Sequence, residues 1–337
     1  PYIAIVICAV IPALLYYIGC AAAVISQSEI AEIQMVDPKD IPKARNVLKD
    51  GWIYLVIIGV LIYCLLGIQL SPLRSALYAS TSVPIIMLFD KKKRFRPKHI
   101  VTSLIKSGFG AMSIVMGCAC AGIVVAMTAL TGIGVVFGDM MIKAAGGNLF
   151  LSLVFTAMAC VILGMGLPTT SAYVIAASIL APSLVTLGLP LLTAHLFVFY
   201  FACLSAITPP VALAAYAGAG LAKCGPMTTA VEACKLGFAG FIAPFAFCYN
   251  NGLLLQGGLV NILSVCFTAL IGTVVISMGF QGWMLWRLNL IERILLVGGG
   301  TLMFKPGTIS DLIGLGIIIV LIVINMKKWK KPGKATA

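Results

Sequence analysis

The sequence predicts an all-α polytopic membrane protein, and its composition and the form of its apolar runs carry that prediction. Of its 337 residues, 61% are hydrophobic and only 10% are charged, whereas soluble domains hold about 25% charged residues. The apolar runs are long and lack the strict alternation of a membrane β-barrel. Of the 23 lysines and arginines, 15 fall in three hydrophilic stretches, residues 39–49, 91–98 and 327–334. Because such clusters follow the positive-inside rule and suit anionic lipid headgroups, the net charge of +13 does not indicate a nucleic-acid partner.

The first part of the chain is expected to hold three membrane spans before a long helix begins. The spans are predicted at residues 2–25, 52–70 and 72–89. Pro12 is expected to kink the first span, and the connector 26–50 is hydrophilic. The basic loop 91–98 is placed in the cytoplasm, which puts the connector on the same side. A long helix is predicted over residues 99–130, and residues 113–147 are interpreted as a re-entrant hairpin, with a full crossing as the alternative.

Two breaks interrupt the apolar sequence farther along the chain. The first is Gly164-Met165-Gly166-Leu167-Pro168-Thr169-Thr170-Ser171, and the second is Ser205-Ala206-Ile207-Thr208-Pro209-Pro210. Proline cannot donate a backbone hydrogen bond, and it moves the preceding residue out of the helical region. Each break therefore frees carbonyl and amide groups, which a membrane tolerates only where protein buries them or where they line a polar cavity.

Hydroxyl groups lie beside both breaks, and with unwound carbonyls they are ligands that a small monovalent cation accepts. Secondary transporters build ion and substrate sites from half-helix ends near the bilayer centre, so the breaks favour a coupled membrane transporter. The alternative is an ordinary kink at each proline, because Gly and Pro are common in membrane helices. Two breaks that are both flanked by hydroxyls, with almost no charge between them, favour the transporter.

Helices are predicted on both sides of each break and in the tail. They are residues 148–163, 172–187, 191–207, 211–222, 227–250 and 259–278, with turns at 188–190 and 223–226. Residues 211–250 are interpreted as a second re-entrant hairpin. In the tail, residues 282–296 are expected to form an amphipathic interfacial helix. Gly298-Gly299-Gly300 is expected to break the chain, and 311–326 to be the last span, with the basic end 327–334 in the cytoplasm.

Residues 1–17 and 226–249 look like two copies of one element, each with a late proline five residues before a closing tyrosine. A chance match is the alternative. The repeat indicates two related halves, so the chain is expected to be part of a longer permease. Four parts are expected: residues 1–25, the end of the first-half transport domain; 26–98, connector and scaffold helices; 99–258, the second-half arm helix and transport domain; and 259–337, extra membrane helices with a basic tail.

The two break motifs resemble the second half of the large membrane subunit of TRAP transporters (tripartite ATP-independent periplasmic transporters). Residues 11–17 resemble the end of the first half in fused permeases, and the tail after about Leu259 is also similar to those forms. The resemblance implies an inverted-repeat, elevator-type symporter of the bacterial inner membrane, with re-entrant hairpins and broken helices. A periplasmic solute-binding protein would deliver an organic anion, usually a carboxylate, and a sodium gradient would supply the energy.

The resemblance also implies the residues of the site. The sodium site would involve Gly164 or Gly166, Ser205 and Thr208, while a first-half sodium site would lie outside this chain. Many relatives have Gly where Ser205 stands, so this ligand is a carbonyl, a hydroxyl or both. The residues expected near the substrate or the ion are Pro168, Thr169, Thr170, Ser171, Pro209 and Pro210.

The alternatives are a proton-coupled carrier, a membrane enzyme and a purely structural subunit. A proton-coupled site normally needs an ionisable residue at depth, and the only acids between Asp90 and Glu292 are Asp139 and Glu232, neither beside a break. An intramembrane hydrolase needs paired acids, metal ligands or a Ser/His pair, for which Ser171 and His195 are the only candidates. No organic cofactor and no transition metal is expected. The paired breaks argue against a structural subunit.

Overall fold

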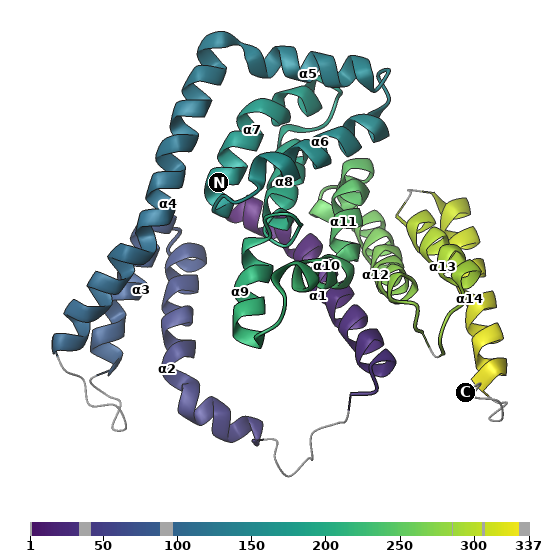
Figure 1. Ribbon diagram of the computed structural model, residues 1–337, viewed down its shortest axis with the longest axis horizontal. Coiled ribbons are helices and arrows are strands. Elements are labelled where there is room, and N and C mark those ends of the chain that lie inside the picture. The colour runs from purple at the N-terminus through teal and green to yellow at the C-terminus, as the bar shows by residue number, and fades with distance from the viewer. Residues whose placement is uncertain (1, 34–41, 88–96, 285, 305–306, 330–337) are drawn as a thin grey trace. The chain divides into compact units, whose positions relative to one another are not determined.

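The computed structural model describes residues 2–33, 42–87, 97–284, 286–304 and 307–329 (Figure 1). Within these ranges the regular elements are helices, together with one β-bridge between Trp283 and Arg287. In chain order they are α1 (Tyr2–Ile30), α2 (Ala44–Ile62), the π-helix η1 (Tyr63–Gly67), α3 (Pro72–Met87), α4 (Pro97–Thr131), α5 (Ile133–Ala144), α6 (Leu149–Gly164), α7 (Thr169–Thr186), α8 (Leu191–Leu204), α9 (Leu213–Ala222), α10 (Pro226–Leu236), α11 (Phe238–Tyr249), the 3-10 helix η2 (Asn251–Leu254), α12 (Leu259–Gln281), α13 (Leu290–Leu302) and α14 (Thr308–Trp329).

The chain divides into two compact units. One consists of residues 1–6 and 33–113, and the other of residues 7–32 and 114–337. The first unit holds α2, α3 and the first part of α4, and its α2 and α3 pack side by side. The second unit contains both predicted breaks. Most of the basic loop 91–98 and of the basic end 327–334 lies outside the described residues, so their side of the membrane stays a prediction.

The lengths of the helices confirm an all-helical, multi-pass membrane protein. Among the described residues four helices are long and apolar enough to span a bilayer, namely α1, Ile100–Thr131 in α4, α7 and α12, and α10 with α11 forms a further pair bent by 43°. The helices beside the breaks are shorter: α6 has 16 residues, α8 has 14 and α9 has 10. At about 1.5 Å per residue none of these three reaches across a hydrocarbon core of about 30 Å.

The core of the second unit is built around α6, α7, α8 and α11. Asn148 begins α6, because its Oδ1 accepts hydrogen bonds from the amides of Phe150 at 2.9 Å and Leu151 at 3.3 Å. The helices α6, α7 and α8 pack along one another, and the predicted turn between α7 and α8 is present, with Gly188 at φ +93°. Leu153, Leu180, Leu184, Phe197 and Phe247 are among the largest side chains buried in this core. Because α6 and α7 lie side by side, the chain folds back at the first break instead of continuing as one interrupted helix.

The re-entrant hairpin predicted for residues 113–147 is wrong. α4 continues to Thr131, and Gly132 then takes the left-handed conformation at φ +65°. α5 packs against α7 rather than along α4, since Gly138 leaves room for the Ser183 side chain; a Cβ at Gly138 would lie 1.8 Å from the Ser183 Oγ. The turn predicted between α9 and α10 is confirmed: the two helices pack side by side, and Lys223 adopts φ +54°.

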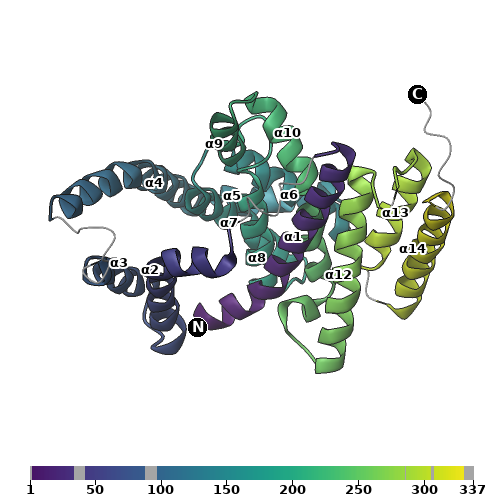
Figure 2. The same ribbon diagram turned by 90° about the horizontal axis from the view of Figure 1, so that it is seen from below.

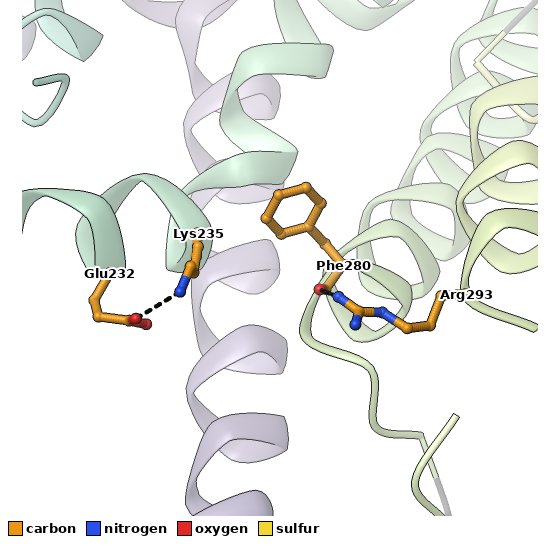
Figure 3. A network of polar contacts seen from close by, with 4 residues as sticks. All are labelled: Glu232, Lys235, Phe280 and Arg293. Atoms are coloured by element: carbon orange, nitrogen blue, oxygen red, sulfur yellow. Dashed lines mark hydrogen bonds and ion pairs between the residues drawn. The ribbon is translucent and has the colours of Figure 1, made fainter. Parts of the chain in front are cut away.

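The amphipathic helix expected at residues 282–296 begins only at Leu290. Gly282 ends α12 at φ +85°, and Asn289 forms a capping box with Glu292 at the start of α13. The Arg293 guanidinium then ties α13 to the end of α12, donating from Nε to the Gly279 carbonyl at 3.2 Å and from Nη2 to the Phe280 carbonyl (Figure 3). The same view shows the exposed ion pair of α10, in which Lys235 Nζ lies 2.7 Å from Glu232 Oε1.

The triple glycine Gly298-Gly299-Gly300 does not break the chain, contrary to the prediction, but lies inside α13. Figure 2 shows α13 beside α12 and α14. Gly300 faces α12, where a Cβ on it would lie 2.7 Å from the Ile276 side chain and 3.0 Å from the Gly272 carbonyl oxygen. Gly299 faces α14 in the same way. These glycines serve close helix packing, as small residues commonly do between membrane helices.

Gly300→Ala is expected to lower the free energy of unfolding by about 1–3 kcal/mol, the usual range for an overpacked contact. The matched control is Gly298→Ala in the same helix, where an added Cβ meets nothing within 4 Å, so its stability should stay the same or rise with helix propensity. Thermal unfolding of the purified protein in detergent measures both. Equal melting temperatures for the two variants would contradict this account of the glycines.

Candidate functional site

The first break is a tight turn between α6 and α7. α6 ends at Gly164, whose carbonyl accepts the Leu167 amide at 3.3 Å, and Gly166 follows at φ +73°. A side chain is strained in that conformation, which accounts for the second glycine of the motif. Pro168 is the N-cap residue of α7, and no side chain caps this helix. The turn therefore presents the uncapped N-terminus of a full-length helix.

The second break has a different geometry. After α8 the amides of Ala206, Ile207 and Thr208 bond to carbonyls three residues back, at 3.2, 3.1 and 3.3 Å, and this tighter winding ends at Pro209. The Ala214 amide reaches back to the Ala206 carbonyl at 2.9 Å. In the described part of the chain α8 and α9 are not among the helices that pack along each other. The chain therefore does not fold back at this break.

The two breaks meet at Gly164 and Ser205. The Ser205 hydroxyl lies 3.2 Å from the Gly164 carbonyl and 2.7 Å from the Ala202 carbonyl, with one proton to donate. Ser205 is only 1% exposed, and a Cβ on Gly164 would lie 2.5 Å from its Oγ. A second contact joins Gly166 to Val211, where an added Cβ would lie 3.3 Å from the valine Cγ1. The structure thus brings neutral oxygens of both breaks together in a buried place.

The Thr208 side chain bonds elsewhere, although its amide donates to the Ser205 carbonyl. Its Oγ1 donates to the Leu204 carbonyl at 2.8 Å. Its side chain also lines a cavity of about 400 Å³ between α6, α8 and α11. Among the described residues that line this cavity, Thr208 carries the one polar side chain, beside apolar residues such as Val161 and Phe241. Of the four residues expected at sodium, the structure brings Gly164 and Ser205 into contact with each other. Gly166 lies against Val211 instead, and the Thr208 hydroxyl donates to the last residue of α8.

The residues expected near the substrate or the ion divide into exposed and covered ones. Thr169 and Thr170 are exposed at the start of α7, as is Pro210 in the second break, while Pro168 and Pro209 are half-buried. Ser171 is fully buried, and its Oγ lies 3.5 Å from the Cys118 Sγ of α4. This neighbour was not predicted, because a run of small residues in a membrane helix carries no signal that it borders a site.

The described residues do not form the sites that an intramembrane hydrolase, a proton-coupled carrier or a metal centre would need. Ser171 faces Cys118, whereas the His195 Nδ1 lies 3.0 Å from the Tyr173 hydroxyl, so the structure does not pair Ser171 with His195. Glu232 is bound to Lys235 at the surface of α10, and Asp139 is exposed on α5. Within the part of the chain that the structure describes, no group of three His, Cys, Asp or Glu residues is placed to hold a metal ion.

The sequence matches a model of a known protein family. The family model described as "Tripartite ATP-independent periplasmic transporter, DctM component" matches residues 1–262. This match includes both breaks and all residues of the candidate site, and it ends just inside α12, so that α13 and α14 lie beyond it. No curated protein and no solved structure shows significant similarity to the chain.

Proposed function

Because the chain belongs to the DctM component family of the tripartite ATP-independent periplasmic transporters, we propose that it drives uptake of an organic anion of the carboxylate class with a sodium gradient. Members of this family are membrane permeases of binding-protein-dependent secondary transporters, not enzymes, and they work with a periplasmic solute-binding protein. The proposal adds the coupling ion, the substrate class and the residues that serve them.

Sodium coupling rests on the contact between Gly164 and Ser205. A buried cluster of neutral carbonyl and hydroxyl oxygens suits a small hard cation, and unwound backbone at the ends of half-helices is where secondary transporters bind such ions. The acids of this region, Asp139 and Glu232, are not at the contact, which favours sodium over a proton. Gly164, Gly166 and Ser205 are assigned to the ion, and Thr208 is kept as the fourth candidate.

The substrate class rests on the start of α7. The first amides of a helix have no partner within the helix, and the helix dipole makes that end attractive to anions. In α7 no side chain caps these amides, and the exposed hydroxyls of Thr169 and Thr170 lie beside them. A substrate carboxylate fits both groups of donors, with Pro168, Ser171, Pro209 and Pro210 shaping the surroundings.

The division into two units supports an elevator-type mechanism, since both breaks belong to one compact unit. In this proposal that unit carries ion and substrate, and the other unit, which holds α2 and α3, belongs to the fixed scaffold. The protein would lie in the bacterial inner membrane, with its basic loops in the cytoplasm.

The decisive experiment is uptake into proteoliposomes that contain the full permease, with the loaded binding protein outside. A tenfold sodium gradient supplies about 1.4 kcal/mol per ion, so accumulation should collapse to equilibrium when sodium is equal on both sides or replaced by potassium. The control imposes a proton gradient alone, with sodium absent. Uptake that ignores sodium and follows the proton gradient would favour the proton-coupled alternative.

A further inference from the structure

Helix α4 meets the tip of the first hairpin, which is formed by residues 168–171, at Gly117 and Cys118. The Cys118 Sγ lies 3.5 Å from the Ser171 Oγ. A Cβ on Gly117 would lie 2.8 Å from the same oxygen and 3.3 Å from Pro168 Cδ. Ser171 is fully buried beneath this contact. One side of the tip is therefore covered by α4, while Thr169 and Thr170 stay exposed.

The close approach is specific to Gly117 among the nearby glycines of its helix. A Cβ added at Gly122, in the same membrane-spanning stretch, would meet nothing within 4 Å. A glycine makes a helix less stable than an alanine does, so the glycine at the tight contact is accounted for by that contact, whereas no contact accounts for Gly122. Gly117 and Gly122 therefore form a matched pair in one helix, one at a tight contact and one without a neighbour within 4 Å.

The Ser171 hydroxyl is held by a thiol, which is a weak hydrogen-bonding partner, and the serine belongs to the first turn of α7. Any shift of Ser171 moves Thr169 and Thr170, because the three residues share that turn. We propose that Gly117 and Cys118 are positioning residues for transport: they fix the hairpin tip, and with it the donors that receive the substrate. This inference rests on the proposed function, in which the start of α7 binds the substrate carboxylate.

The test compares Gly117→Ala with Gly122→Ala in the full permease in proteoliposomes, measuring initial uptake against the concentration of loaded binding protein. Gly117→Ala should raise the half-saturating concentration at least about tenfold, because losing one hydrogen bond to a charged substrate group costs about tenfold or more in affinity. Gly122→Ala should behave as the unsubstituted protein. Equal half-saturation in the two variants, or a loss of maximal rate alone after Gly117→Ala, overturns the proposal.

Substitutions at Cys118 provide a second test, which stays informative even if Gly117→Ala fails to fold. Cys118→Ser keeps a hydrogen-bonding group and should stay near the unsubstituted half-saturation, whereas Cys118→Val removes it and should raise half-saturation. Matching values for these two variants would overturn the role of the thiol. If the proposed sodium coupling is wrong, the unsubstituted permease will show sodium-independent uptake. The comparison of Gly117→Ala with Gly122→Ala is made at one sodium concentration and does not depend on that result.

Discussion

Replacing Gly164 by alanine is expected to abolish uptake while the protein still inserts and folds. An added Cβ would lie 2.5 Å from the Oγ and 2.8 Å from the Cβ of Ser205, both inside normal contact distance. Ser205 is buried, so the two breaks must move apart to admit the methyl group. Misplacement on this scale costs about a hundredfold in rate, and the oxygens of the two breaks that we propose as ion ligands separate as well.

The measurement is the initial rate of sodium-driven uptake per amount of folded permease, with monodispersity in detergent as the check on folding. Gly218→Ala is the control, because this α9 glycine lies near the second break and an added Cβ there meets nothing within 4 Å. Ser205→Gly introduced into the Gly164→Ala variant removes the clashing atoms. Partial recovery in this double variant would show coupling between the two residues. Normal uptake by Gly164→Ala alone would show that the contact between the breaks is dispensable.

The positions of the breaks were predictable because their causes are local. Prolines that remove donors and glycines that allow positive φ act within a few residues, and α6 and α8 indeed end at Gly164 and Leu204. The path of the chain after each break was not predictable, since both motifs combine glycine or proline with hydroxyls. Whether the chain folds back, as it does after Gly164, depends on helices that pack around it, and no local pattern encodes those neighbours.

The predictions of a chain break at the triple glycine of α13 and of a hairpin at 113–147 were wrong for a related reason, namely that packing partners distant in the sequence decide the outcome. A glycine inside an apolar run weakens a helix, yet it also permits close packing. Whether the helix breaks or continues through the glycine depends on the surface that packs against it. Gly300 lies against α12, and Gly138 lies against Ser183 of α7, two contacts that join residues distant in the sequence. The same limit explains why the neighbour of Ser171 was missed while Gly164 and Ser205 were found through the family resemblance.

Ser205→Ala is expected to raise the sodium concentration for half-maximal uptake by about tenfold, and Thr208→Val should raise it less. Removing one partner from a buried polar contact costs about 1–3 kcal/mol, and about 1.4 kcal/mol corresponds to a factor of ten in affinity. The Ser205 hydroxyl lies at the junction of the two breaks, whereas the Thr208 hydroxyl is satisfied by Leu204 and its side chain lines an apolar cavity. Both replacements nearly conserve volume, so packing changes little.

Initial uptake rates measured over a range of sodium concentrations at saturating binding protein separate the two variants, since only an ion ligand shifts the sodium half-saturation while sparing the maximal rate. Ser205→Gly is the informative comparison, because it removes the hydroxyl and keeps the backbone carbonyl at this position. A normal sodium response in both Ser205 variants would leave only the carbonyl as ligand at this position. A larger shift in Thr208→Val than in Ser205→Ala would instead place the cation toward Pro209, at the end of the second break and away from Gly164.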